Sequence, residues 1–204
     1  MVVTKVKQIK SVNKLSDGIK YIENGAKTIS SEFIDSELNF PIKFVNDKPV
    51  SQLISGNLII DVESAYSEMM QLKQLANIEN GRPINNEKIR NNDVLAHHII
   101  QSFSPEDNLT PEQVHEIGRK TALELTGGSH QFVIATHMDK GHLHNHIYIN
   151  STNSVTLNKF RWQKGTKKAL EQISDKYADL AGAKIIDRQN QFGHKEYSAY
   201  QKEN

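Results

Sequence analysis

Residues 131–150 read QFVIATHMDKGHLHNHIYIN and carry the pattern that most constrains the fold. Two runs rich in β-branched and aromatic residues, Gln131–Thr136 and Leu143–Asn150, flank a short polar segment that contains a glycine. Runs of this kind separated by a short loop are typical of paired antiparallel strands. The segment therefore predicts a β-hairpin.

Four of the nine histidines of the chain fall in one ten-residue stretch of this hairpin, residues 137–146. Side chains two residues apart on a strand point to the same face, about 6.6 Å apart, so His144 and His146 can bind one metal ion. His137 ends the first strand across the loop and supplies a third ligand. Three neutral imidazoles leave coordination positions open, as catalytic metal sites do. The alternative is that these are exposed loop and strand histidines.

Two further residues of the hairpin have supporting roles in this prediction. His142 lies on the same strand face, but at about 13 Å from His146 it is far for a shared ion, so it is a reserve ligand. Asp139 is a candidate hydrogen-bond acceptor that orients one of the imidazoles.

The spacing of hydrophobic residues predicts the other elements. Residues Thr110-Pro111-Glu112-Gln113 combine an N-cap, a proline at the first helical position and a capping-box glutamine, which predicts the start of a helix that ends at Gly127-Gly128. The remaining expected elements are strands at Val2–Ile9, Val94–Phe103 and Ala183–Asp187, and helices around Leu15–Ile22, Ser64–Asn77 and Leu170–Leu180.

The hairpin and the non-alternating order of strands and helices predict an α+β fold, with a central, mostly antiparallel sheet and helices packed on one face. We expect residues 1–187 to form one domain. Residues 27–52 are polar and predict a long loop or insertion. Residues 188–204 are a polar tail, expected to begin a linker to a C-terminal region.

Composition excludes several classes of protein. The chain has 204 residues, 25 Lys and Arg against 24 Asp and Glu, and no cysteine. Disulfide frameworks, thiolate zinc sites and cysteine nucleophiles are therefore excluded. The longest apolar runs are far shorter than the roughly 20 residues of a membrane span. We expect a protein without membrane insertion that acts inside the cell.

Two segments are distinctly basic. Residues 1–20 carry five lysines against a single acid, Asp17. The second segment, residues 159–168, interleaves aromatic side chains with positive charge and has no acid, a mixture that suits phosphates and stacked bases. Its alternative is a solvated loop and helix start. The candidate DNA-binding residues from the two segments are Lys20, Lys159, Arg161, Trp162, Lys164, Lys167 and Lys168.

Tyr21 lies beside the apolar stripe of the first predicted helix and not on it, so its hydroxyl is reachable. Lys20 and Lys27 bring positive charge nearby in the sequence. A phenol can attack phosphorus when a metal polarises the phosphoryl oxygens. The alternative is a boundary tyrosine whose hydroxyl meets water.

Four stretches together resemble the relaxase, or mobilisation nuclease, branch of the HUH endonucleases of plasmids and conjugative elements. The strongest is THMDKGHLHNHIYINS at 136–151, which is similar to the metal-binding motif of that family. The motif that holds the nucleophilic tyrosine in this family resembles LSDGIKYIENGAKT at 15–28. The segment that follows this motif in the family resembles LISGN at 53–57. VLAHHIIQSF at 94–103 is similar to the strand that ends in serine. Residues 29–50 are longer than the usual connector.

The resemblance implies an activity and a set of roles. Tyr21 would attack a scissile phosphate of single-stranded DNA at an origin of transfer, giving a 5′-phosphotyrosyl protein and a 3′-hydroxyl that can later reseal the strand. His137, His144 and His146 would hold a divalent cation, Mg²⁺ or Mn²⁺, with Zn²⁺ as an alternative. Ser102 would help to hold the DNA. An accessory DNA-binding protein, a coupling protein and a bacterial cytoplasmic location are also implied.

Other functions fit the same residues. A rolling-circle replication initiator of the same superfamily would share the chemistry but act on a different target. A single-stranded DNA-binding metal module without cleavage would form no covalent product. A metallohydrolase of small phosphate esters would have no use for Tyr21. Tyr148, Tyr177, Tyr197 and Tyr200 are other phenols that could act.

Overall fold

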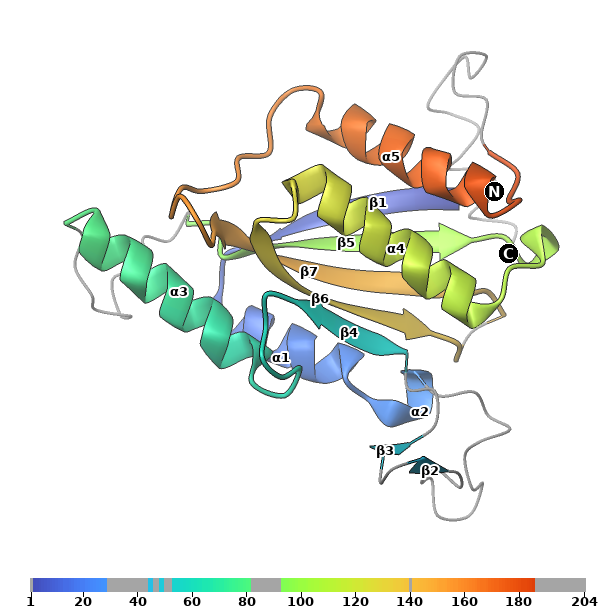
Figure 1. Cartoon of the computed structure of the whole chain (residues 1–204), viewed down its shortest axis with the longest axis horizontal. Helices are drawn as coiled ribbons and strands as arrows, with labels where there is room; N and C mark the ends of the chain where they lie inside the picture. Colours follow the sequence, from blue (N-terminus) through green and yellow to red (C-terminus); the bar gives the residue numbers. More distant parts are fainter. Residues whose placement is uncertain are drawn as a thin grey trace.

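The predicted hairpin forms the centre of a five-stranded antiparallel sheet (Figure 1). It consists of β6 (His130–His137) and β7 (His144–Asn153), and the strand order is β1-β5-β7-β6-β4. The computed structural model describes residues 2–28, 44–45, 48–49, 53–81, 93–139 and 141–185. The antiparallel sheet with helices packed on it confirms the α+β prediction.

Most of the longer elements lie close to the ranges predicted from the hydrophobic spacing. The remaining strands of the sheet are β1 (Val2–Ile9), β4 (Ile54–Asn57) and β5 (Ala96–Phe103), and β2 (Phe44–Val45) pairs with β3 (Lys48–Pro49) separately. The helices are α1 (Val12–Ile22), α2 (Gly25–Thr28), α3 (Ala65–Glu79), α4 (Pro111–Thr126), α5 (Thr166–Leu180) and the short 3₁₀ helix η3 (Pro105–Asp107).

The start of α4 shows how local chemistry sets a helix boundary. The Thr110 hydroxyl accepts a hydrogen bond from the Gln113 amide (3.2 Å), and the Gln113 side chain accepts one from the Thr110 amide (2.9 Å). This reciprocal pair satisfies amide groups that the first turn of a helix leaves without partners. The capping box predicted from the sequence is confirmed.

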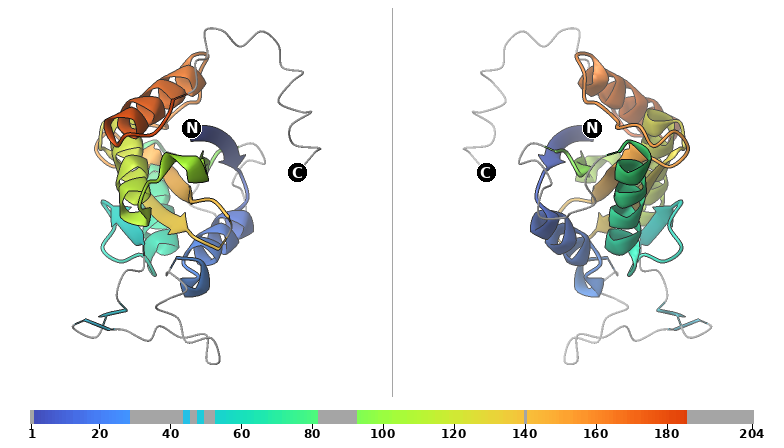
Figure 2. Two further views of the ribbon diagram at one scale, coloured as in Figure 1. Left: turned by 90° about the vertical axis from the view of Figure 1, so that its right-hand side faces the viewer. Right: turned by 90° about the vertical axis from the view of Figure 1, so that its left-hand side faces the viewer.

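Helices cover both faces of the sheet, so the prediction of helices on one face was wrong. α4 and α5 pack on one face and α1 and α3 on the other (Figure 2). The reason lies in the central strands, which are buried on both sides. On β7, Ile147 packs in the cluster that includes residues of α4 and α5, whereas the next residue, Tyr148, packs in the cluster of α1 and α3.

Two smaller expectations also differ from the structure. Ala183–Ile185, in the segment expected to form a last strand, have no regular structure, and the rest of that segment lies outside the described residues. β4 was not predicted as a strand, because its four residues contain the turn-forming Ser55-Gly56-Asn57 and no alternation. Apart from β2 and β3, residues 29–50 lie outside the described part of the chain, as does the tail at 188–204. None of the described helices is long and apolar enough to cross a membrane.

α4 packs closely on the sheet because residue 118 has no side chain. A Cβ on Gly118 would lie 2.4 Å from Nδ2 of Asn145. That nitrogen donates hydrogen bonds to the Gln101 side chain (2.9 Å) and the Val114 carbonyl (2.7 Å), while Oδ1 of Asn145 accepts one from the Thr136 hydroxyl (2.6 Å). This buried network joins β5, β6, β7 and α4, and it anchors the strands that carry the histidines.

The variant Gly118→Ala is expected to lower the free energy of unfolding by about 1–3 kcal/mol, the usual cost of overpacking a buried contact. The added methyl group would meet Asn145 and also Cδ1 of Ile134, at 2.5 Å. Urea denaturation measures the loss. Gly141→Ala is the matched control, because nothing lies within 4 Å of a Cβ at that position. Equal stability of the Gly118→Ala variant and the wild type would contradict close packing of α4.

Candidate metal centre and nucleophile

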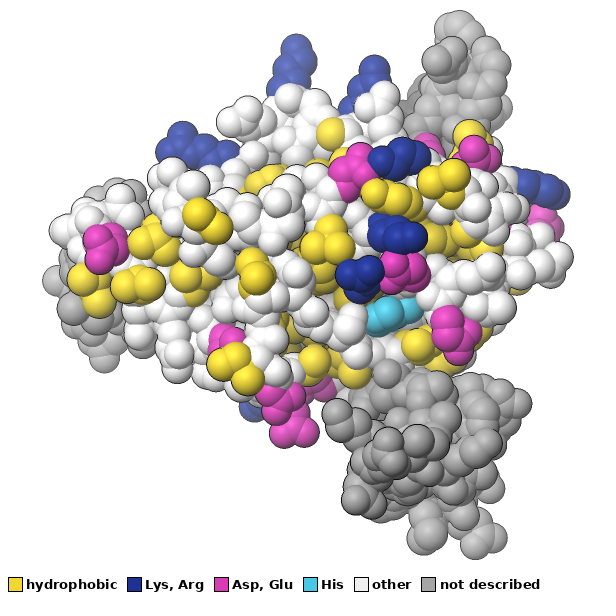
Figure 3. All heavy atoms as spheres, viewed as in Figure 1, with side chains coloured by type: hydrophobic (Ala, Val, Ile, Leu, Met, Phe, Trp, Pro, Cys, Tyr) yellow, Lys and Arg dark blue, Asp and Glu magenta, His cyan; other side chains and the backbone are white. Residues whose placement is uncertain are grey.

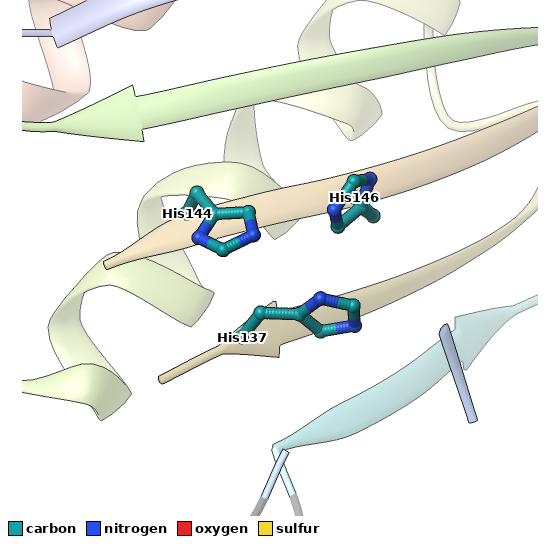
Figure 4. A group of neighbouring side chains, drawn as sticks. All are labelled: His137, His144 and His146. Carbon is teal, nitrogen blue, oxygen red and sulfur yellow. The ribbon is translucent and has the colours of Figure 1, made fainter. Parts of the chain in front are cut away.

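Three histidines meet at one end of the sheet. The register of the hairpin pairs His137 with His144 and Ala135 with His146. One nitrogen from each of the three imidazoles lies within 4.8 Å of the others, and all three side chains are buried. Figure 4 shows the rings around one common space, two of them from β7 and one from β6. Two ligands of one ion at about 2.1 Å lie at most about 4.2 Å apart, so small side-chain rotations suffice to bind a metal.

Hydrogen bonds indicate which nitrogens would bind the ion. Nδ1 of His144 is 3.4 Å from the His142 carbonyl, which can only accept, so Nδ1 carries the proton and the lone pair lies on Nε2. His137 differs, since neither of its ring nitrogens has a hydrogen-bond partner among the described residues. Burying an imidazole in this way costs free energy. A cation bound by the three rings would remove that cost, so the donor set fits a divalent metal.

Burial also keeps the ligands in the form that binds metal. Desolvation, and to a lesser extent the nearby His144, lower the pKa of His137 to about 4. The imidazole is therefore neutral near pH 7, and only a neutral imidazole has a lone pair to donate.

His98 on β5 supports this cluster and was not identified from the sequence. Its Nε2 lies 2.8 Å from Nδ1 of His146, and its ring stacks on Tyr148 with centroids 4.1 Å apart. Burial lowers the pKa of His98 to about 4, so its ring is neutral and its Nε2 can accept a hydrogen bond from Nδ1–H of His146. That bond would place the lone pair of His146 on Nε2, and a partner of this kind orients a metal-binding histidine.

Tyr21 lies beside the cluster at the end of α1. Its ring centroid is 5.6 Å from that of His137 and 6.0 Å from that of His146, and the side chain is 45% exposed. α1 reaches this position because Gly18 allows close approach: a Cβ there would lie 2.4 Å from the Tyr148 hydroxyl oxygen. The phenol is thus both near the histidines and accessible.

Lys27 of α2 binds the hydroxyl of this tyrosine. Its ammonium group donates a hydrogen bond to Tyr21 Oη (2.8 Å) and forms an ion pair with Asp139 (3.5 Å). The hydrogen bond to the phenol raises the pKa of Lys27, which stays charged. Asp139 therefore holds the lysine beside Tyr21, and its orientation of an imidazole stays a prediction.

His142 does not join the metal cluster. Its ring centroid is 5.3 Å from that of His144, but the described histidines and acids that share a possible ion are His137, His144 and His146. The strand β7 begins only at His144, so His142 belongs to the loop and the face assigned to it from strand geometry does not apply.

The open part of the same sheet face carries hydroxyl and basic groups. Ser102 pairs with His144 across β5 and β7, so both point to one face. On the neighbouring edge strand, Lys5 and Lys7 alternate onto this face and are exposed. Lys20 is exposed on α1 directly before Tyr21.

The second basic segment lies on the other face of the sheet. Trp162 and Phe160 pack against His97, with ring centroids 5.5 and 5.4 Å away, on the side of α4 and α5. Lys159 forms an ion pair with Asp93. Lys167 pairs with Glu171, and Arg161, Lys164 and Lys168 are exposed. Figure 3 shows acidic and basic side chains side by side over this face. The structure does not bring Lys159, Arg161, Trp162, Lys164, Lys167 or Lys168 to the histidine cluster.

Comparison with known proteins points to one family. Residues 25–182 match the family model described as Relaxase, MobA/VirD2-like, nuclease domain. The match includes the three histidines and begins after Tyr21. A solved structure described as the molecular basis of vancomycin resistance transfer in Staphylococcus aureus has a TM-score of 0.50 at 15% identity, over 94% of this chain and 100% of that one. At this identity, the similarity supports the fold alone.

Curated relatives agree with the family model. The chain is 42% identical, over an alignment of 229 residues, to the group II intron-interrupted relaxase LtrB of Lactococcus lactis subsp. cremoris, covering 98% of this chain and 41% of that protein. It is 32% identical over 136 residues to a protein rlx of Staphylococcus aureus, covering 67% of this chain and 38% of that protein. The chain thus spans about two fifths of the length of these relatives. The resemblance seen in the motifs is confirmed, and the chain belongs to the MobA/VirD2-like relaxase family.

Proposed function

We propose that this chain nicks one strand of DNA at an origin of transfer by a transesterification in which Tyr21 is the nucleophile. The observation that carries the proposal is the meeting of a half-exposed phenol with three histidines whose donor atoms lie within 4.8 Å of one another. A nucleophile beside a cation site is suited to attack at phosphorus. The membership of the chain in a relaxase family supports the same reaction.

His137, His144 and His146 would hold the divalent cation. Mg²⁺ or Mn²⁺ is the proposed ion, and Zn²⁺ is the alternative because imidazole ligands suit it. When bound, the cation would polarise the non-bridging phosphate oxygens and balance the negative charge that develops on them.

The proposed reaction replaces one phosphodiester bond of the DNA with a phosphotyrosyl ester. Tyr21 Oη forms a bond to phosphorus while the bond from phosphorus to the 3′ oxygen breaks. The phenol gives up its proton, and the departing oxygen takes one up as a 3′-hydroxyl. The products are a 5′-phosphotyrosyl protein and a free 3′ end. Because one diester replaces another, the 3′-hydroxyl can attack the phosphotyrosine and rejoin the strand.

Lys27 assists the attacking oxygen in this scheme. Its hydrogen bond to Tyr21 Oη, at 2.8 Å, favours the charged phenolate that forms as the proton leaves. The ion pair with Asp139 keeps the ammonium group in place. The nucleophile thus has a cationic donor on one side and the histidine cluster on the other.

The single-stranded DNA would lie on the open sheet face beside the cluster. Ser102 pairs with His144 there, Lys5 and Lys7 line the edge strand, and Lys20 is exposed directly before Tyr21. Phosphate contacts by these lysines would weaken as salt rises. An accessory DNA-binding protein and a coupling protein are the proposed partners of the full-length protein in the bacterial cytoplasm.

Formation of a covalent adduct tests the function. With Mn²⁺ and single strands from the candidate origin of its own element, the protein is expected to give an adduct that survives a denaturing gel. Tyr21→Phe should abolish it, since it removes the attacking oxygen, and His144→Ala should reduce it at least about 100-fold, the scale on which loss of charge stabilisation slows an enzyme. Tyr177→Phe is the matched control, because that phenol binds Glu124 on the opposite face.

Two other results would change the proposal. An adduct that persists in Tyr21→Phe would assign the nucleophile to another tyrosine. Binding of DNA with no adduct on any strand would favour a non-catalytic DNA-binding module.

Replacing Lys27 tests its role at the phenol. Lys27→Met keeps the length of the side chain but removes the donor, and we expect adduct formation to slow about 10- to 100-fold while the affinity for DNA changes little. Quenched time courses with saturating DNA measure the rate. Lys120→Met removes the same charge from α4 on the other face and should leave the rate unchanged. A slow rate in both variants would mean that the net charge of the protein, and not the contact between Lys27 and Tyr21, determines the rate of adduct formation.

The contact between His98 and His146 predicts a change in metal affinity. His98→Phe retains a ring against Tyr148 but lacks the acceptor, so Mn²⁺ should bind about 10- to 100-fold more weakly. Isothermal titration calorimetry measures this without DNA. His97→Phe is the matched control on the opposite sheet face, and its affinity should equal that of the wild type. Unchanged affinity in His98→Phe would exclude a positioning role for His98.

A further inference from the structure

A group of exposed basic side chains lies on α5 and on the segment before it. Its members are Arg161, Lys164 and Lys168, which we call the outer basic residues. Lys159 and Lys167 do not belong to this group, because each forms an ion pair with an acid. Figure 3 shows basic side chains that project along the upper margin of the molecule, where Figure 1 places the start of α5 and the segment before it. The proposed reaction gives this positive surface no role.

The segment that carries these residues is held on the fold by specific contacts. The Phe160 amide donates a hydrogen bond to the Ser151 carbonyl (2.7 Å) at the end of β7. The rings of Phe160 and Trp162 pack against His97, which is buried. Both aromatic side chains are themselves partly buried, so their main contact is with the protein. The positive charges beside them are therefore attached to a fixed backbone.

The outer basic residues and the histidine cluster lie on either side of the edge strand β1. Val6 of β1 and Trp162 both pack against the core cluster that includes Leu170 of α5. Lys5 and Lys7 flank Val6 and point to the opposite face, because side chains alternate along a strand. β1 is the last strand of the sheet on this side. Two sets of basic residues thus meet at one edge of the sheet, one set on each face.

Lys5 and Lys7 connect this edge to the histidine cluster. Lys5 pairs with Ile100 across β1 and β5, and Ile100 pairs with His146 across β5 and β7. Neighbouring strands lie about 4.8 Å apart, so the backbone of Lys5 is about 10 Å from that of His146. Lys7 pairs with His98 in the next row on the same face. Basic residues therefore extend from the cluster to the edge of the sheet and continue on α5.

This arrangement suits a flexible polyanion. Residues 159–168 contain no acid, and the first turn of α5 has none either, so the positive end of the helix dipole adds to the same field. Positive charge spread along a surface binds the phosphates of a nucleic acid backbone. The surface turns around a strand edge from one sheet face to the other. Duplex DNA, with a persistence length of about 150 base pairs, resists so sharp a turn, whereas a single strand can follow it.

We infer that single-stranded DNA leaves the histidine cluster over Lys5 and Lys7, turns around β1 and continues along the outer basic residues. These five residues together form the basic tract. The inference rests on the proposed function, because it takes the histidine cluster as the place where the scissile phosphate binds. Phosphate contacts carry no sequence information, so the tract would hold DNA that flanks the nick without selecting the nick site.

Binding to strands of increasing length tests the tract. The parent protein carries Tyr21→Phe so that no cleavage interferes, and fluorescence anisotropy measures its affinity for single strands of the candidate origin, lengthened stepwise on either side of the nick. The outer variant adds Arg161→Gln, Lys164→Gln and Lys168→Gln. It is expected to bind long strands about 10- to 100-fold more weakly than the parent at about 0.1 M salt, and short strands equally well. Its plot of log affinity against log salt should be less steep by about 2, because each phosphate contact on a single strand contributes about 0.7.

The matched control carries Lys120→Gln, Lys176→Gln and Lys184→Gln in the same parent. These lysines are exposed on α4, late on α5 and after α5, so the control loses the same charge outside the tract. Its affinity for long strands should stay close to that of the parent. Circular dichroism verifies that each variant is folded.

A complement annealed to the flank tests the turn around β1. The duplex flank should bind the parent and the outer variant equally, because it cannot follow the edge of the sheet. Equal affinity of the two proteins for single strands of every length would overturn the inference, as would the absence of binding to every strand. A larger loss on the duplex flank would overturn it in favour of a surface for duplex DNA.

Crosslinking follows the path of the strand independently of charge. The chain has no cysteine, so Lys164→Cys provides a single thiol for a photoreactive benzophenone label. This label is expected to crosslink to the flank of a long strand and not to a short strand. Lys184→Cys, labelled in the same way, is the matched control and should crosslink to neither. No crosslink from position 164, or equal crosslinking from both positions, would contradict the proposed path.

The outcome is separable from that of the proposed function. A length-dependent loss in the outer variant, with no adduct from the protein that retains Tyr21, would retain the basic tract and reject the nicking activity. An adduct that depends on Tyr21, with equal affinity of the parent and the outer variant at every length, would do the reverse.

Discussion

The register between β6 and β7 is the constraint on which the site depends. It places His137 opposite His144 and Ala135 opposite His146, so three imidazoles share one face. A slip of one residue would send the side chains of one strand to the other face and separate the ligands. The buried bonds of Asn145 to Thr136, Gln101 and Val114 oppose such a slip, because each would be left without its partner.

The two faces of the sheet differ in how they are covered. The face under α4 and α5 is closed by apolar packing and by the amide network, and it carries the stability of the central strands. The opposite face is covered by α1 and α3 over one part and left accessible near the histidines. Because α1 ends at this boundary, Tyr21 is both anchored by its helix and accessible to solvent.

Each candidate group in the site has a neighbour that holds it. His98 binds His146, Lys27 binds Tyr21, and Asp139 pairs with Lys27. These contacts bring together β5, α2 and the loop after β6, which are far apart in the sequence. Such support is what keeps reactive groups within the small tolerances that catalysis requires.

Local patterns were sufficient for much of the molecule. The hairpin, the capped start of α4 and the shared face of His144 and His146 all follow from the period of two along a strand or from bonds within one turn, and no distant residue is needed to foresee them. The tyrosine motif also lies in one continuous stretch, residues 15–28, and the role of Tyr21 as the nucleophile stays a prediction. By contrast, β4 has too few residues and too many turn formers to be recognised without its partner β6.

Only the tertiary structure decided which residues from distant segments of the chain come into contact. The sequence does not tell which of His97 and His98 points to which face of the sheet. Both residues are buried, and they are adjacent on a strand that is covered on both sides. Packing places His98 against the cluster, and it places Trp162 against His97, away from the site that its basic neighbours suggested. The sequence by itself determined the hairpin that carries the three histidines, since strand geometry is local, while the three-dimensional packing of helices and strands determined which other side chains reach it.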